Sequence, residues 1–219
     1  MFDLYDNLTA RLRAGGDYIW PLGLRLILFW EFWEAGISKY RGENWFAEIP
    51  WADWQKGFPW PFSALGPDLN WIAATAGEMV FSILILLGLF TRFAAISLVV
   101  ITGVATAAVH WPAQWNSFAQ LWSGYVITAD DAGNFKLPLL FLVMLLPLVF
   151  HGGGKISLDH LLLKITGRDS CISDRFGDGI AAALVFAVLG VATVFLEPAW
   201  GITFFVVAVL LGLTPSLRR

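Results

Sequence analysis

The stretch GEMVFSILILLGLFTRFAAISL, from Gly77 to Leu98, decides the fold class. Two apolar runs flank a short turn that ends at Arg92, and Glu78 is the only charged residue within the runs. An apolar run of about 20 residues has the length of a helix that crosses a bilayer. The stretch therefore predicts two transmembrane helices joined by a tight turn.

The composition of the whole chain indicates the same class. Of 219 residues, 58% are hydrophobic and 14% are charged, and the mean hydropathy is +0.67. Soluble domains carry about 25% charged residues. We therefore interpret the chain as an integral membrane protein, and its net charge of -3 gives no reason to expect a nucleic-acid partner. A single cysteine, Cys171, excludes an internal disulfide and a cysteine cluster for zinc or iron–sulfur.

Six apolar segments follow one another, each bounded by charge, glycine or proline. They are residues 18–40, 71–90, 93–110, 136–150, 179–196 and 200–213. Neither an internal repeat nor a low-complexity linker divides them, so we expect a single membrane domain over residues 1–219. The first twenty residues lack the pattern of a cleavable signal peptide, and the segment after them is expected to be retained.

Lysine and arginine residues gather in alternate connections between these segments. Nine of them lie at the two ends of the chain or in the connections after the second and fourth segments, and four lie in the remaining connections or at the segment ends that border them. The positive-inside rule then places both termini in the cytoplasm.

Two connections on the predicted outer side are rich in Trp and Phe, which prefer the level of the lipid headgroups. The first, ENWFAEIPWADWQKGFPWPF (43–62), contains Pro50, which can begin a short helix, and Gly57, which can end it. In the second, Pro112 can begin a helix with one aromatic stripe at helical spacing: Trp111, Trp115, Phe118, Trp122 and Tyr125. Such a surface either anchors the protein in the membrane or forms a vestibule for a lipid-soluble ligand or a partner.

Charged residues within the apolar segments are the best lead to function, because they are costly in a membrane and usually face the bundle interior. They are Arg25, Glu31, Glu34, Lys39 and Glu78. Counting about 1.5 Å per residue from the outer helix ends places Glu31 and Glu78 at one depth, roughly 12 Å. We expect them to lie near each other or near Arg25 or Lys39. Such a group is either an ion-pair network that fixes helix packing or a proton or cation site.

The histidines allow two interpretations as well. His110 ends the third segment beside Trp111, where it can bind a soft metal or shuttle protons, or simply cap the helix. His151 and His160 flank GGGKISLD (152–159), in which Ser157 can cap a short interfacial helix with an apolar stripe. The glycine run lacks the spacing of a phosphate-binding loop.

Three stretches together resemble the DoxX family of bacterial membrane proteins: GLRLILFWEFWEAGISKY (23–40), the opening stretch, and GGGKISLD. The resemblance runs from about Pro21 to Leu163. The residues that match the family pattern are Arg25, Gly36 and Lys39 in the first stretch, Glu78, Gly88, Leu89, Thr91 and Arg92 in the second, and Gly152, Ser157, Leu158 and Asp159 in the third.

This resemblance implies an all-α, polytopic bundle in the bacterial inner membrane, with a four-helix core over residues 18–166. Two features depart from the family pattern: the long aromatic outer loops with their short interfacial helices, and a further helix pair over residues 176–213. DoxX relatives are similar to the small subunit of a thiosulfate:quinone oxidoreductase and are linked to redox partners. Others accompany copper-handling, ribosomally made peptides.

Two hypotheses follow. In the first, the protein is a redox-associated subunit that binds a quinone or a partner oxidoreductase at its outer face, near His110, Trp111, Trp115 and Trp122, while Arg25, Glu31 and Glu78 handle protons. In the second, it is a non-enzymatic protein for copper or small-molecule handling, with a cation path through Glu31, Glu34, Glu78 and His110. No catalytic residue, resident metal site or cofactor motif is identifiable, and the oligomeric state stays open.

Overall fold

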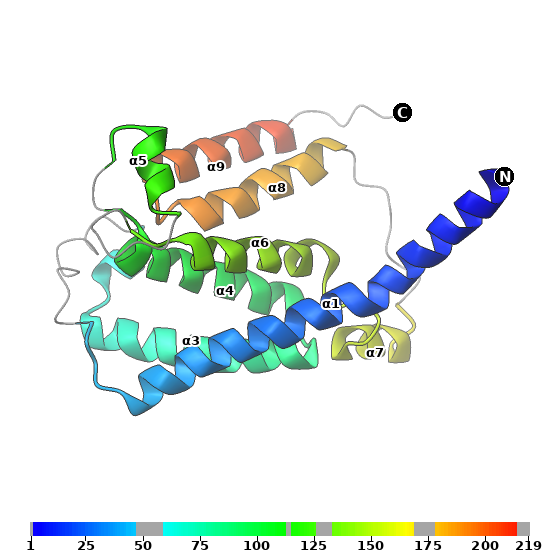
Figure 1. The fold of residues 1–219 in the computed structure, drawn as a ribbon, viewed down its shortest axis with the longest axis horizontal. Helices are drawn as coiled ribbons and strands as arrows, with labels where there is room; N and C mark the ends of the chain where they lie inside the picture. The colour runs from blue at the N-terminus through cyan, green and yellow to red at the C-terminus, as the bar shows by residue number, and fades with distance from the viewer. Residues whose placement is uncertain (1, 47–58, 113–114, 126–132, 169–177, 214–219) are drawn as a thin grey trace.

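The computed structural model describes residues 2–46, 59–112, 115–125, 133–168 and 178–213 (Figure 1). Every regular element within these ranges is a helix. The long helices are α1 (Phe2–Arg41), α3 (Pro67–Leu87), α4 (Thr91–Ala105), α6 (Lys136–His151), α8 (Asp178–Thr193) and α9 (Pro198–Leu213). The short ones are η2 (Phe62–Ala64), the π-helical turn η3 (Thr106–His110), α5 (Phe118–Ser123) and α7 (Leu158–Ile165).

Helices α1, α3, α4 and α6 pack around a shared apolar core. Contacts join α1 to α3, α3 to α4, α4 to α6 and α6 back to α1. The core residues come from all four helices and include Leu28, Ile85, Leu98, Leu145 and Leu148. We call the end at which α1 and α4–η3 finish the aromatic end, and the end that carries α7 the basal end (Figure 1).

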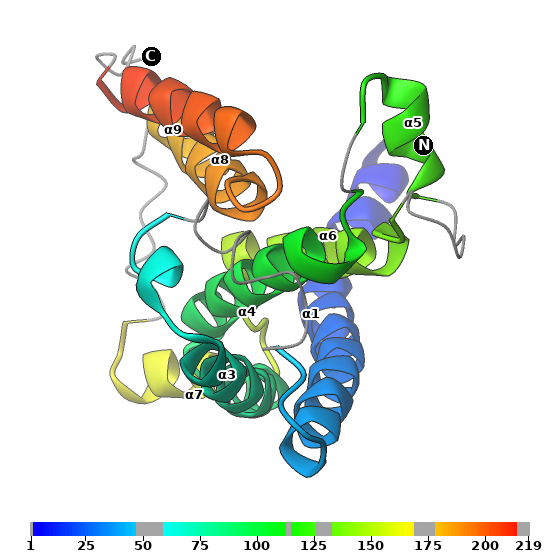
Figure 2. The same cartoon turned by 90° about the vertical axis from the view of Figure 1, so that its left-hand side faces the viewer.

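Helices α8 and α9 pack mainly on each other and lie to one side of the four helices (Figure 2). They touch the bundle through α4, where Gly103 faces the Phe195 ring and the Ala192 carbonyl. The close approach of α8 to α9 depends on small residues, since a Cβ at Gly201 would lie only 2.4 Å from the Cα of Val194.

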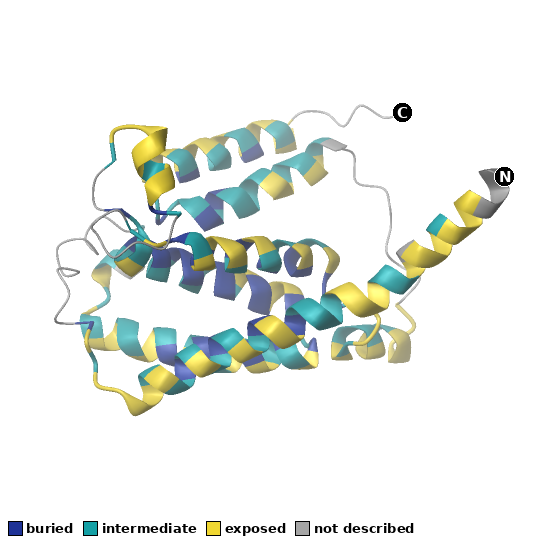
Figure 3. Ribbon diagram, in the orientation of Figure 1, coloured by how far each residue is buried: buried dark blue, intermediate teal, exposed yellow. Residues whose placement is uncertain are grey.

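Many residues on the outward faces of these helices are exposed (Figure 3), and a large share of them are large and apolar. Examples are Ile72 on α3, Phe93 on α4, Leu184 on α8 and Val209 on α9. Exposed apolar side chains in such number are unusual on a soluble monomer and typical of a lipid-facing surface. Two helices are long and apolar enough to cross a membrane, Pro67–Leu87 and Thr91–His110, and three more are shorter and apolar.

Helix α1 begins well before the apolar segment that was predicted to start at residue 18, and it extends past the bundle at the basal end (Figure 1). Pro21 lies inside it and has no N–H for the carbonyl of Asp17. The backbone N–H of Lys155 donates to that carbonyl instead, at 3.1 Å. The helix therefore continues through the proline because the glycine loop supplies the missing donor.

The predicted aromatic helix of the second outer loop is wrong in its extent. Trp111 is extended backbone, and α5 begins only after Ser117, whose side chain accepts from the N–H of Gln120. The Gln120 side chain in turn accepts from the N–H of Asn116, at 2.7 Å. This reciprocal capping fixes the start of the helix and splits the stripe. The short helix predicted between Pro50 and Gly57 lies outside the described residues.

Candidate functional site

A buried ion pair joins α1 and α3. Lys39 Nζ lies 2.8 Å from both carboxylate oxygens of Glu78. The Glu78 side chain is 5% exposed and that of Lys39 is 19% exposed. Separating these charges in an apolar bundle would leave one buried without its counter-ion, at a cost of about 3 kcal/mol or more. Lys39 and Glu78 are therefore expected to remain paired.

Gly36 sets the distance between the two helices at this level. A Cβ on Gly36 would lie 3.3 Å from Glu78 Cβ, 3.2 Å from the backbone nitrogen of Met79 and 2.7 Å from its Cγ. Only glycine allows α3 to pack this closely, which brings the Glu78 carboxylate within reach of Lys39, one turn further along α1.

The structure does not bring Glu31 to Glu78. Gly36 is the α1 residue level with Glu78, and Glu31 lies five positions, or about 7 Å, deeper along α1. The equal-depth estimate assumed that both helices end at one level, but α3 already begins at Pro67 and extends further outward. Glu31 is half-buried and makes no hydrogen bond or ion pair within the described residues, and Glu34 is exposed.

Arg25 belongs to a different part of the molecule, at the basal end. Its Nε donates to the carbonyl of Ile85 at 2.7 Å, and Nη2 donates to that of Leu86 at 2.5 Å. Nη1 donates to the carbonyls of Gly153 and Ile156, at 3.0 and 2.5 Å. One guanidinium thus donates to four backbone carbonyls, two at the end of α3 and two in the glycine loop. The five predicted polar residues thus form no single site.

Asp159 and Arg92 complete this basal cluster. Both Asp159 carboxylate oxygens accept backbone N–H groups at the start of α4, from Phe90 at 2.7 Å and Thr91 at 2.8 Å. Arg92 Nη1 donates to the last carbonyls of α6, those of Val149 and Phe150, at 2.8 and 2.6 Å. The residues that matched the family pattern at this end therefore act mainly as helix caps across elements.

At the aromatic end, the predicted outer-face residues form separate contacts. His110 is half-buried, and its Nδ1 contacts the side-chain oxygen of Asn134. Trp111 packs on Phe135 at 5.0 Å between ring centroids, and its indole N–H is buried without a hydrogen-bond partner. Trp122 stacks on Tyr125 at 4.7 Å.

Trp115 reaches the last helix pair. Its ring lies 5.8 Å from that of Trp200 on α9, and its Nε1 donates to Glu197 Oε1 at 3.0 Å. A third aromatic group, Trp45, Phe46 and Trp71, lies above the Lys39–Glu78 pair, with ring centroids 5.0 to 5.9 Å apart. Trp71 precedes Glu78 by two helical turns and so shares its face of α3.

The carboxylates and histidines do not converge on a common point in the described part of the chain. Within it, no three residues of the His, Cys, Asp or Glu types are grouped to hold a metal ion. Both oxygens of Glu78 are occupied by Lys39.

The apolar outward faces and the interior charges define a helical membrane protein, and comparison with known proteins identifies its family. The family model named DoxX matches residues 20–111. An uncharacterized protein of Haemophilus influenzae is 39% identical over 156 residues, which cover 71% of this chain and 91% of that relative. No solved structure matches the chain. The chain belongs to the DoxX family.

Sequence reasoning missed several partners of the predicted residues. Nothing in the sequence singled out Glu197, which accepts from Trp115, or Asn134, which contacts His110. Neither residue carries a motif that would have marked it. Asp159 did have a signal, since it stands in the stretch that matches the family, but its capping of α4 depends on the approach of two distant segments.

Proposed function

We propose that this DoxX-family membrane protein is a redox-associated subunit that binds a quinone between its aromatic end and the Lys39–Glu78 pair. The observation that carries the proposal is that buried bidentate ion pair, which lies beneath the ring cluster of Trp45, Phe46 and Trp71. A flat, apolar ring ligand would find aromatic walls and one charged, hydrogen-bonding group at its polar edge.

The chemistry of a quinone explains the need for the ion pair. Reduction of a quinone to a quinol takes up two electrons and two protons. The electrons would come from a partner oxidoreductase that docks at the same end. Lys39 could donate one of the two protons toward a quinone oxygen and take a proton back from water, with Glu78 stabilising the ammonium form; water would supply the second proton directly.

The alternative of copper handling has less support from the geometry. It requires Glu31, Glu34, Glu78 and His110 to line one path, whereas Glu34 is exposed and Glu78 is fully engaged by Lys39. Native mass spectrometry, which tests quinone binding below, would also detect bound copper.

The decisive experiment is native mass spectrometry of the purified protein after addition of a menaquinone or ubiquinone. We expect Glu78→Gln to weaken quinone retention by about tenfold, equivalent to roughly 1.4 kcal/mol, because the Lys39 charge loses its counter-ion beside the ligand. Glu34→Gln is the matched control, since it removes a carboxylate from an exposed position of α1 and should change nothing.

A double variant separates function from helix packing. Lys39→Met combined with Glu78→Gln removes both charges and should recover most of the thermal stability lost in Glu78→Gln. If the pair serves the quinone, the double variant stays unable to retain it. Recovery of quinone retention along with stability, or no retention by the wild-type protein, would contradict the proposed function.

We further propose that the chain crosses the membrane six times, as a four-helix core and an added pair, α8 and α9, with both termini in the cytoplasm. The charge distribution along the chain and the packing of α8 on α4 support this arrangement. The aromatic end then faces the periplasm and the basal end faces the cytoplasm.

A further inference from the structure

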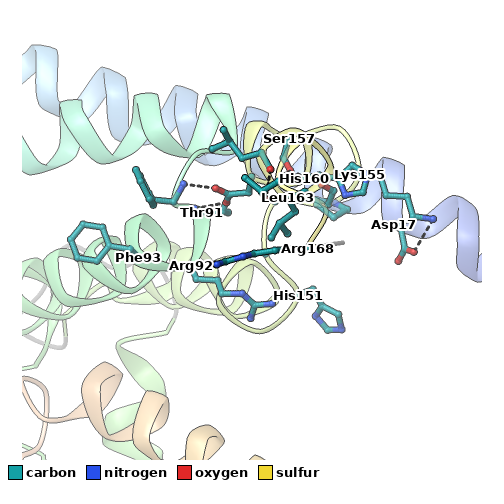
Figure 4. A pocket seen from close by; sticks show the side chains of 18 residues that line it. Asp17, Thr91, Arg92, Phe93, His151, Lys155, Ser157, His160, Leu163 and Arg168 are labelled. Atoms are coloured by element: carbon teal, nitrogen blue, oxygen red, sulfur yellow. Dashed lines mark hydrogen bonds and ion pairs between the residues drawn. The ribbon is translucent and has the colours of Figure 1, made fainter. Parts of the chain in front are cut away.

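A cavity of about 820 Å³ opens at the basal end, away from the proposed quinone site (Figure 4). Its walls come from α1, the α3–α4 turn, the end of α6, the glycine loop and α7. Because α3 ends and α4 begins here, and both are long enough to cross the bilayer, the cavity lies at the level of a membrane–water interface whichever way the protein faces.

The charged side chains that line the cavity differ in whether they already have partners. Arg92, Lys155 and Arg168 line it, with the acidic residues Asp17 and Asp159. Asp159 is used by the backbone N–H groups at the start of α4, and Asp17 lies 3.6 Å from Lys155. Three basic residues thus face two carboxylates, one used by backbone N–H groups and one beside a lysine, so the lining has an excess of positive charge.

Two guanidinium groups keep free donors. Arg92 uses only Nη1 for the α6 carbonyls, which leaves its Nε and Nη2 hydrogens. Arg168 is exposed and makes no side-chain hydrogen bond or ion pair within the described residues. Figure 4 shows both side chains, with His151, in the same part of the cavity. Planar arginine groups are well suited to the oxygens of a phosphate.

The rim of the cavity is apolar. Phe90 is 64% exposed and Phe93 is 62% exposed, and Leu162 contributes from α7. Leu158, Leu161 and Ile165 of α7 are exposed too, as expected for a helix that lies in the interface. A ligand in the cavity would contact arginine side chains at one end and an apolar surface suited to acyl chains at the other.

We propose that this cavity binds the phosphate headgroup of an anionic phospholipid, held by Arg92 and Arg168, with its acyl chains along Phe90, Phe93 and α7. Basic pockets at the cytoplasmic ends of transmembrane helices bind such headgroups in general. The site is independent of quinone binding at the opposite end.

The test uses the full-length protein, freed of native lipid in detergent and titrated with dioleoyl phosphatidylglycerol or dioleoyl phosphatidylcholine under native mass spectrometry. We expect retention of phosphatidylglycerol and little retention of phosphatidylcholine. Arg168→Gln should weaken phosphatidylglycerol binding by about fivefold, the effect of one interfacial cation. The matched control is Lys164→Gln, which removes a positive charge from α7, one turn before Arg168 but outside the cavity, and should leave binding unchanged.

A competition arm separates a lipid from a free phosphate. Glycerol 3-phosphate carries the phosphate without acyl chains, so at millimolar concentration it should not displace the bound lipid. Displacement by glycerol 3-phosphate, equal retention of the two lipids, or equal loss in the Arg168 and Lys164 variants would each overturn the proposal. Arg168 is exposed, so its replacement leaves the fold intact and the result interpretable.

Discussion

At the scale of single residues, two glycines of α1 have opposite consequences for stability. A Cβ at Gly36 would meet the backbone and side chain of Met79, whereas a Cβ at Gly23 would meet nothing within 4 Å. Both residues lie in the same helix. Alanine substitutions at the two positions therefore separate the effect of close helix packing on stability from the effect of helix propensity.

We expect Gly36→Ala to lower the free energy of unfolding by about 1–3 kcal/mol, since α1 and α3 must move apart. Gly23→Ala should raise it by about 0.5–1 kcal/mol, because alanine favours the helix. Thermal unfolding of both variants in one detergent measures the difference. If the two variants shift the unfolding temperature in the same direction, α1 and α3 do not pack as closely at Gly36 as described here.

The sequence names Lys39 among three possible partners of Glu78, beside Glu31 and Arg25, but it could not choose among them. A charge within an apolar run is visible without a structure because its burial is costly. Its partner depends on where neighbouring helices end, and the extra turn of α3 before Trp71 shifts the depth of Glu78 relative to α1. For the same reason Arg25 stayed among the possible partners of the carboxylates, whereas it donates to backbone carbonyls.

At the scale of helices, α4 begins without a cap of its own. Its N-cap residue, Phe90, has a left-handed backbone with φ of 48° and no capping side chain. Asp159, from a segment almost seventy residues later, supplies both missing acceptors. The carboxylate also complements the positive end of the helix dipole.

We expect Asp159→Ala to lower the free energy of unfolding by about 1–2 kcal/mol, the usual cost of losing an N-cap. Asp159→Asn should lose less, because its amide oxygen still accepts one hydrogen bond. Chemical unfolding in detergent, with both variants compared to the wild-type protein, provides the measurement. Equal stability of the alanine variant and the wild-type protein would show that Asp159 does not cap α4.

The sequence predicted which segments form helices more readily than it predicted where each helix begins and ends. The four core segments and the last two all correspond to helices, since long apolar runs leave little choice. The ends of α1 and α5 were misplaced for local reasons. A distant N–H from Lys155 lets α1 pass Pro21, and reciprocal capping at Ser117 delays α5.

At the scale of the whole molecule, α8 and α9 form a unit of their own. They pack chiefly on each other and present apolar side chains outward. The match to the Haemophilus influenzae relative leaves nearly three-tenths of this chain without a counterpart there. The added pair meets the aromatic end through Trp115, Glu197 and Trp200, so it adjoins the surface where a partner of the proposed subunit would dock.

The orientation of the molecule is open to direct test with topology reporters. Alkaline phosphatase is active only in the periplasm. Green fluorescent protein does not fluoresce after export by the general secretory route, so its fluorescence reports a cytoplasmic position. We expect fluorescence and no phosphatase activity for fusions after Arg92, after Arg168 and after Arg219, because the basic residues concentrate in these connections. A fusion after Lys136 should give the reverse. If only the Arg219 fusion showed phosphatase activity, one helix of the α8–α9 pair would not cross the membrane. Phosphatase activity of the Arg92 fusion would mean that the core has the opposite orientation, with the basal cavity on the periplasmic side.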